Sequence, residues 1–250
     1  MSYGLHLSAA GANAQNHRLQ VLSNNLANVQ TAGYKPQQAV IQARFAELIE
    51  RGEALPGTGG VNDVGGGLTI QPEVTQHGEG PLRSTGNETD FAINDPTTFF
   101  VVQRDDQSLL TRAGNFLFNS SGQLINQQGD RVLDQQGRNI SIDPTLPHSI
   151  LNGGRIQQGE EVFTLMLARP EKVGDLKHLG GNLFQPGEEL PVLRGNDRPV
   201  VSGFLEQSGV QPTTAMMELI EASRAYEANA RMIQNQDTVV GTLISRVLQG

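Results

Sequence analysis

The chain has 250 residues, no cysteine, 5% aromatic residues and a formal net charge of −8. The lack of cysteine excludes disulfides, thiolate zinc sites and a cysteine nucleophile, and an acidic chain without a basic run argues against a broad nucleic-acid surface. We find no stretch of about 18 apolar residues that would predict direct membrane insertion, and no cationic start followed by an apolar run that would indicate a secretory signal peptide.

The first 29 residues contain no proline and are rich in Ala, Asn, Gln and Leu, which predicts a helix over Ser2–Val29. Apolar residues recur at steps of three and four and form a narrow stripe. This stripe resembles a seam for another helix more than a face for a deep core. Its clearest members are Leu19, Leu22, Leu26 and Val29.

Turn-forming residues end this helix, and the first segment is predicted to span residues 1–36. Residues 37–50 then carry Val40, Ile41, Phe45, Leu48 and Ile49, which predicts a second, shorter helix. A Gly-rich loop or linker is predicted to follow, so that residues 37–67 form one segment.

Residues 68–205 contain short apolar runs separated by turn residues and predict a central antiparallel β domain. Asp105-Asp106 suits a turn after the run that begins at Phe99. A repeat with a period of eight follows, because Leu124–Gly129 is echoed by Val132–Gly137. Two strands with equally spaced turns predict a meander. Val162–Leu167 predicts another strand.

The last segment, residues 206–250, predicts a long helix over Thr213–Leu248, with Thr213 or Thr214 as its N-cap. Steps of three and four alternate without a break for more than four heptads. An exposed seam of this kind is unfavourable, since each fully buried Leu or Ile contributes roughly 1.5–3 kcal/mol. The heptad positions are Met216, Leu219, Ser223, Tyr226, Ala230, Ile233, Asp237, Val240, Ile244 and Val247.

The predicted fold class is therefore α+β, with N- and C-terminal helices forming a coiled-coil layer and a central antiparallel β domain between them in sequence. The terminal helices could pair with one another or with neighbouring copies. Pairing between copies leaves a free surface on each subunit, and a contact of that kind that does not close builds a filament.

Catalytic patterns are absent from the sequence. The five histidines have no metal-ligand spacing, the Gly-rich stretches lack the Lys-Ser/Thr of a nucleotide site, and no Gly-x-Ser-x-Gly occurs. We therefore predict no enzymatic activity, no cofactor and no metal. The histidines are His6, His17, His77, His148 and His178.

The two ends of the chain carry specific motifs. Residues 22–35, Leu-Ser-Asn-Asn-Leu-Ala-Asn-Val-Gln-Thr-Ala-Gly-Tyr-Lys, closely resemble the N-terminal signature of flagellar rod and hook proteins. Residues 223–230, Ser-Arg-Ala-Tyr-Glu-Ala-Asn-Ala, resemble the C-terminal block of the same family. Residues 80–118 are similar to the central β region of rod proteins. The chain is short for a hook protein, which favours a rod subunit of proximal or distal type.

This resemblance implies a non-catalytic subunit of the flagellar basal-body rod, a periplasm-spanning structure that transmits torque. It implies self-assembly, contacts with other rod and hook axial proteins, and delivery through the flagellar type III export apparatus. We expect Tyr34 and Tyr226 to anchor the assembly interface, and Asn24, Asn25 and Asn28 to form bonds within or between helices. The remaining interface candidates are Leu19, Leu22, Leu26, Leu219, Ile233, Val240 and Ile244.

Two other functions remain open at this point. A phage-tail or adhesin-like binding module would use the heptads in a closed trimeric coiled coil. A β-domain hydrolase acting on cell wall would need an acid/base pair, which the sequence does not reveal.

Overall fold

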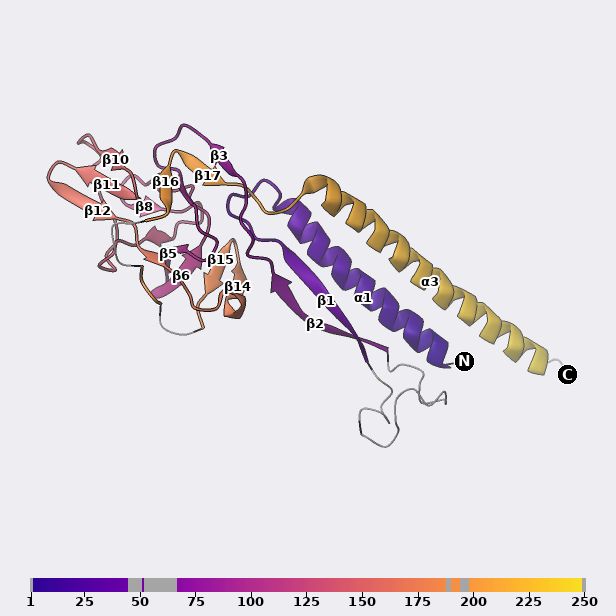
Figure 1. Cartoon of the computed structure of the whole chain (residues 1–250). Helices are drawn as coiled ribbons and strands as arrows, with labels where there is room; N and C mark the ends of the chain where they lie inside the picture. The colour runs from indigo at the N-terminus through magenta and orange to yellow at the C-terminus, as the bar shows by residue number, and fades with distance from the viewer. Residues whose placement is uncertain (1, 45–50, 52–66, 188–189, 194–197, 249–250) are drawn as a thin grey trace. The chain divides into compact units, whose positions relative to one another are not determined.

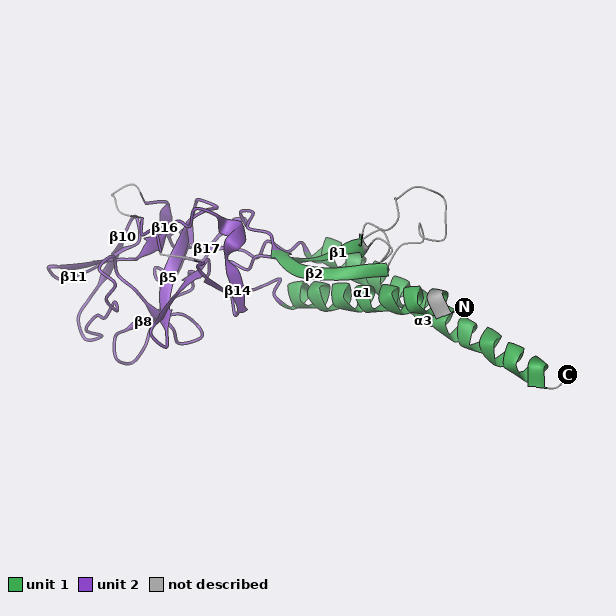
Figure 2. Ribbon diagram, turned by 90° about the horizontal axis from the view of Figure 1, so that it is seen from below, with its two compact units in different colours: residues 1–27, 37–74, 212–250 green, residues 28–36, 75–211 purple. Residues whose placement is uncertain are grey.

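The computed structural model describes residues 2–44, 51, 67–187, 190–193 and 198–248. The chain divides into two compact units. Unit 1 combines residues 1–27, 37–74 and 212–250, and unit 2 combines residues 28–36 and 75–211 (Figure 2). Both ends of the chain therefore belong to one unit, and the β region between them forms most of the other.

Unit 1 contains two long helices, α1 (Ser2–Ala27) and α3 (Pro212–Leu248). Both predicted terminal helices are confirmed. The C-terminal one begins at Pro212, where the missing N–H of proline costs no helical hydrogen bond, so Thr213 and Thr214 lie in its first turn rather than cap it. The helices lie side by side and run in opposite directions (Figure 1).

The prediction of a helix over residues 37–50 is wrong where the structure describes the chain. Gln37–Arg44 is strand β1, which pairs with β2 (Gly67–Thr75). Residues 45–50 and the predicted linker at 52–66 lie outside the described residues. Val40 and Ile41 are also β-branched residues, which fit a strand well, and the neighbouring strand and α1 together select that conformation.

The two-stranded sheet packs on α1, which lies between it and α3 (Figure 1). Asn25 of α1 is buried and forms two hydrogen bonds with the backbone of Gln37, where β1 begins. Its Nδ2 donates to the Gln37 carbonyl at 2.7 Å, and its Oδ1 accepts from the Gln37 N–H at 2.9 Å. Farther along α1, His17 Nε2 lies 3.8 Å from Glu73 Oε1 of β2. Residues 68–74, predicted to open the β domain, therefore belong to unit 1.

Unit 2 is an antiparallel β structure, as predicted. Its largest sheet has the strand order β14-β15-β6-β5-β9-β8-β7, with β13 also paired to β5. Smaller sheets contain β10-β11-β12, β16-β4 and β17-β3. One 3₁₀ turn, η2, spans Val173–Asp175. The strands are β3 (Leu82–Ser84), β4 (Phe91–Ile93), β5 (Phe99–Arg104), β6 (Gln107–Thr111), β7 (Leu117–Phe118), β8 (Leu124–Ile125), β9 (Arg131–Val132), β10 (Ser149–Leu151), β11 (Arg155–Gln158), β12 (Glu161–Thr164), β13 (Leu167–Ala168), β14 (Lys177–Gly180), β15 (Leu183–Gln185), β16 (Val200–Ser202) and β17 (Phe204–Glu206).

The core of unit 2 lies on both faces of β5. Because successive side chains of a strand point to opposite faces, Phe100 and Val102 join one buried cluster while Phe99 and Val101 join the other. This explains why the run at residues 99–102 is continuously apolar rather than alternating. The single strand predicted over Val162–Leu167 is divided between β12 and β13.

The predicted meander is confirmed, and its repeat has a common hydrogen-bond pattern. Asn126 Oδ1 accepts the backbone N–H groups two and four residues later, at 2.9 and 2.8 Å. Asp134 Oδ1 repeats this geometry at 2.9 and 2.8 Å, and Asn119 Oδ1 adds a third copy at 3.0 and 2.9 Å. Each turn also contains a glycine at positive φ, which explains the Gly in each repeat. The predicted turn at Asp105-Asp106 is present as well, with φ of 45° and 63°.

Candidate assembly surface

The most exposed apolar surface of the described chain follows α3. Tyr226 is 40% exposed, Val240 37% and Ile244 55%. Leu219 and Ile233 are partly buried. These are the five C-terminal residues predicted for the interface, and all lie on the same heptad stripe. Further large apolar side chains exposed on this helix are Met216, Met217, Ile220, Met232, Val239, Leu243, Val247 and Leu248.

The inward face of α3 has a different composition. Its buried residues are Ala215 and Ala222, and Asn229 and Gln236 lie against glycines of α1. Small and polar residues therefore make the closest described contacts of α3 with α1, while Leu219 and Ile233 are only partly buried. Each of these four residues precedes a residue of the predicted seam by one position, which corresponds to a rotation of about 100° around the helix axis.

The N-terminal interface candidates are divided between surface and interior. Asn24 is exposed, and its Nδ2 lies 3.4 Å from Gln37 Oε1. Leu19 and Leu26 are partly buried. Leu22 is only 7% exposed, and Asn25 is held by the backbone of β1. Leu22 and Asn25 thus stabilise unit 1 itself.

The turn that follows α1 belongs to unit 2, where it is tightly held. Asn28 Oδ1 accepts a 3.1 Å hydrogen bond from Thr31 Oγ1. Gly33 has a φ of +65°, and a Cβ at this position would lie 2.4 Å from the carbonyl carbon of Arg112. Tyr34 is buried, and its carbonyl accepts from the Gly209 N–H at 3.0 Å. The motif therefore serves as a close-packed insertion into the β structure.

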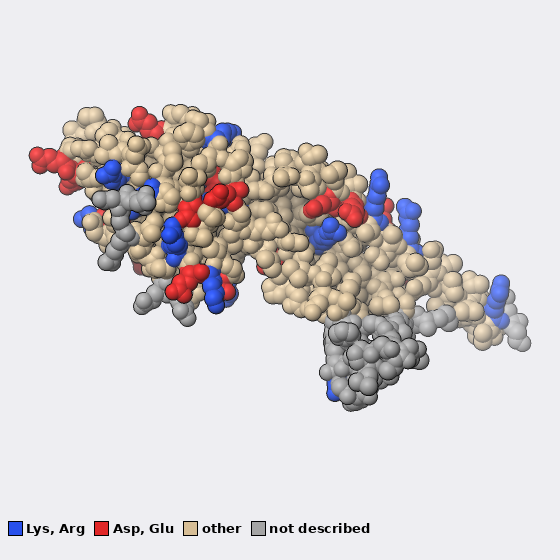
Figure 3. Space-filling model, viewed as in Figure 1, with Lys and Arg blue, Asp and Glu red and all other residues tan. Residues whose placement is uncertain are grey.

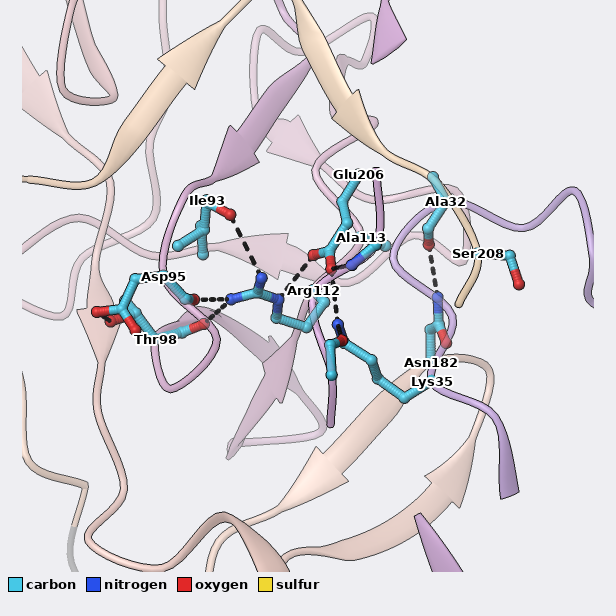
Figure 4. A network of polar contacts seen from close by, with 12 residues as sticks. Ala32, Lys35, Ile93, Asp95, Thr98, Arg112, Ala113, Asn182, Glu206 and Ser208 are labelled. Carbon is cyan, nitrogen blue, oxygen red and sulfur yellow. Dashed lines mark hydrogen bonds and ion pairs between the residues drawn. The ribbon is translucent and has the colours of Figure 1, made fainter. Parts of the chain in front are cut away.

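Three buried charged side chains surround the end of this motif (Figure 4). Glu206 accepts from Lys35 Nζ at 2.6 Å through Oε1 and from Arg112 Nε at 2.8 Å through Oε2. The Gly80 N–H donates to the same Oε1 at 2.9 Å. Each of the three side chains is at most 1% exposed. Arg112 also donates to the backbone carbonyls of Ile93, Asp95 and Thr98.

Burial would raise the pKa of Glu206, but the Arg112 and Lys35 cations outweigh it and hold that pKa below its ordinary value. The carboxylate is therefore charged. Nearby, His77 packs against the rings of Phe99 and Phe184, with centroid distances of 6.0 and 5.3 Å. Burial, together with the charges of Lys35 and Arg112, lowers the pKa of His77 to about 4, so it is neutral at pH 7.

Sequence reasoning did not identify this charged cluster. In the sequence, Lys35 and Arg112 stand only within the longer family-like stretches at residues 22–35 and 80–118, and Glu206 lies in neither of them. Its signal is weak because a glutamate six residues before a helix is an ordinary surface residue, and only the fold brings residues 35, 112 and 206 together.

The remaining surface gives no sign of a nucleic-acid or catalytic site within the described part of the chain. On the face shown in Figure 3, acidic and basic side chains are interspersed rather than gathered into a basic patch. In the described ranges, no three His, Asp or Glu side chains are placed to hold a metal ion. The described helices include none that is long and apolar enough to cross a membrane.

Paired terminal helices with an exposed apolar row, and an antiparallel β unit formed by the chain between them, define an α+β structural subunit. Comparison with known proteins identifies its family. The model for flagella basal body rod proteins matches residues 5–35, that for the D1 domain of flagellar hook protein FlgE/F/G matches residues 92–158, and that for the C-terminal region of flagellar basal body rod FlgEFG proteins matches residues 201–246.

Full-length relatives agree with these matches. The chain is 30% identical to the flagellar basal-body rod protein FlgF of Caulobacter vibrioides over 249 residues, covering 99% of this chain and 98% of that protein. It is 32% identical to FlgG of Agrobacterium fabrum over 270 residues, covering 98% and 99%, and 29% identical to FlgG of Bacillus subtilis over 266 residues, covering 98% and 99%. The chain belongs to the flagellar basal-body rod protein family. It is a structural subunit of the rod in the flagellar basal body, and the phage-tail or adhesin alternative is not favoured.

Proposed function

We propose that this rod subunit polymerises through the outward apolar row of α3, which docks on the terminal helices of neighbouring copies. The central members of this row are Tyr226, Val240 and Ile244. The helices of adjacent subunits then form a coiled-coil layer of a periplasm-spanning axial tube. Torque passes from subunit to subunit through this packing.

The exposure of the α3 row is the observation that supports this proposal. Burying apolar surface contributes about 25 cal/mol per Å². A half-exposed side chain such as Ile244, at 55%, would therefore gain roughly 1 kcal/mol on docking. Several such residues on one helix make assembly favourable, whereas single exposed apolar residues are ordinary on any surface.

The geometry of α3 favours an open polymer over a closed oligomer. Gln236 lies against Gly4 near the start of α1, so the apolar part of α3 that follows Gln236 extends beyond α1 (Figure 1). Every copy therefore presents both this apolar segment and a helix pair on which another copy can dock. A contact between two different surfaces continues from copy to copy when its rotation does not close. Contacts with other axial proteins of the rod and hook follow from the same surfaces.

We assign the N-terminal candidates a supporting part in this interface. Leu19, Asn24 and Leu26 retain exposure along α1 and can contact a neighbour. Leu22, Asn25 and Tyr34 are buried within the chain and fix the helix and its turn. We further propose delivery by the flagellar type III export apparatus, as the family membership suggests.

The proposal can be tested with Val240→Gln and Ile244→Gln combined in one chain. Both side chains are exposed, so unfolding of the isolated subunit should change little, while assembly should be lost because two apolar contacts become polar. The measurement is rod formation, seen by electron microscopy of basal bodies from cells that contain only the variant. Swimming in soft agar provides a second readout.

Ser245→Gln is the matched control, because it adds the same side chain in the same exposed turn without removing an apolar group. It should leave rods intact. Normal rods in the double variant would contradict the proposal. Secretion of each variant into the medium must also be measured, since a variant that is not exported would fail for another reason.

A further inference from the structure

The contact between α1 and α3 is filled by pairs of unequal residues. On α1, a Cβ placed on Gly11 would lie 3.0 Å from Asn229 Oδ1. A Cβ placed on Gly4 would lie 2.9 Å from Gln236 Nε2. Each glycine thus leaves room for one long polar side chain of the facing helix.

The two pairs are related by one heptad on each helix. Gly4 and Gly11 are seven residues apart, and so are Gln236 and Asn229, in the opposite direction. Two further heptad steps along α3 lead from Asn229 to Ala222 and then to Ala215. Ala222 is fully buried and Ala215 is 7% exposed, as close helix contact at these positions requires.

The size order therefore reverses along the seam. At one end α1 contributes the small residue and α3 the large one, and at the other end α3 contributes the small residue. We propose that this reversal sets the register of the two helices, because the four layers pack well in only one alignment of α1 and α3. We call this arrangement the register code. Polar residues at core positions of coiled coils are known to fix register.

Shifting one helix by a heptad shows why the code is selective. One shift moves Asn229 into the layer that now holds the fully buried Ala222, where a longer side chain has no room. The opposite shift sets Ala222 against Gly11 and leaves a void in that layer. Overfilled and underfilled layers are both unfavourable in packed interiors. The side chain of Asn229 is also held in place, because its Nδ2 donates to the Ala225 carbonyl at 2.9 Å.

This code deepens the proposed function. It sets which residues α3 presents to a neighbour. The consequence for assembly rests on the proposed function, whereas the register itself can be tested in the isolated full-length subunit.

The natural chain has no cysteine, so introduced cysteine pairs report the register directly. Gly11→Cys with Asn229→Cys should form an intramolecular disulfide on mild oxidation of the dilute monomer. Gly4→Cys with Asn229→Cys, and Gly11→Cys with Gln236→Cys, are each displaced by one heptad. One heptad is about 10 Å along a helix, beyond the reach of a disulfide, so these pairs should cross-link at least roughly tenfold more slowly. Equal rates for a matched and a displaced pair would overturn the code.

A layer exchange gives a second test that does not depend on cysteine chemistry. Gly11→Asn should lower the midpoint of thermal unfolding of unit 1, because two asparagines then share one layer. Adding Asn229→Gly restores one large and one small residue and should recover much of the loss. Ala9→Asn, which adds the same side chain at an exposed position of α1, is the control. A double variant less stable than Gly11→Asn would overturn the code, and neither result depends on whether the chain polymerises.

Discussion

Glu206 is the residue whose replacement should most disturb unit 2. Its carboxylate accepts from Lys35, Arg112 and the Gly80 backbone N–H, in a site where none of the three charged side chains exceeds 1% exposure. The change Glu206→Gln keeps the shape but removes the only negative charge of the three. The two buried cations then lose the carboxylate that bonds both of them, and an amide N–H₂ replaces one acceptor.

Breaking a buried ion pair by removing one partner typically costs about 3–5 kcal/mol, because the remaining charge stays desolvated. We expect Glu206→Gln to lower the free energy of unfolding of unit 2 by an amount in this range. Urea unfolding followed by far-ultraviolet circular dichroism measures it for the whole chain. Hydrogen exchange at the Leu110 amide, in the core strand β6, assigns the loss to unit 2.

Arg138→Gln is the matched control within the same unit. Arg138 Nη2 lies 2.8 Å from Asp134 Oδ2, but the Arg138 side chain is 67% exposed. Exposed pairs of this kind contribute roughly 0–1 kcal/mol, so this variant should remain close to the unaltered protein. If Glu206→Gln costs no more than Arg138→Gln, the buried cluster does not stabilise unit 2 as argued.

Two further outcomes follow from the same region. Unit 2 should lose stability as the pH falls from about 6.5 to about 4, because the unfolded chain protonates His77 near its ordinary pKa while the folded chain holds that pKa near 4. Glu206, whose pKa in the folded chain lies below its ordinary value of 4.5, adds a further loss of stability at lower pH. Urea midpoints at pH 7 and pH 5 measure this, and His77→Gln should reduce the difference between them. Gly33→Ala should destabilise unit 2 by more than about 2 kcal/mol. A φ of +65° is unfavourable for alanine, and the added Cβ would collide with the Arg112 backbone. An unchanged melting temperature would contradict this prediction and show that the turn can shift at little cost.

The sequence was informative wherever a local pattern matches a local structure. The terminal helices follow from long runs without proline, and the meander follows from equally spaced Gly turns. In both cases the residues that determine the structure lie within a few positions of one another. The common Asx-type hydrogen bonds of Asn119, Asn126 and Asp134 show that the repeat has a direct physical basis.

Residues 37–44 show where local patterns fail. Val40 and Ile41 satisfy a short helical pattern and a strand pattern equally well, which is a known ambiguity of short apolar runs. The outcome depends on β2, which lies more than twenty residues later, and on two hydrogen bonds between the Asn25 side chain and the Gln37 backbone. The charged cluster is a more extreme case, because residues 35, 112 and 206 meet only in the completed fold.

The heptad pattern of α3 is compatible with pairing within the chain and with pairing between copies, and the sequence alone does not distinguish the two. A regular apolar stripe predicts that a helix has a partner, which is either the other terminal helix of the chain or a helix of a neighbouring copy. The structure instead places α1 against the adjacent stripe of Ala215, Ala222, Asn229 and Gln236. A helix with a small and polar inner stripe and an apolar outer stripe is suited to two partners at once, one within the chain and one outside it. In the assembly proposed above, the outer stripe of the heptad is the surface that contacts a neighbouring copy.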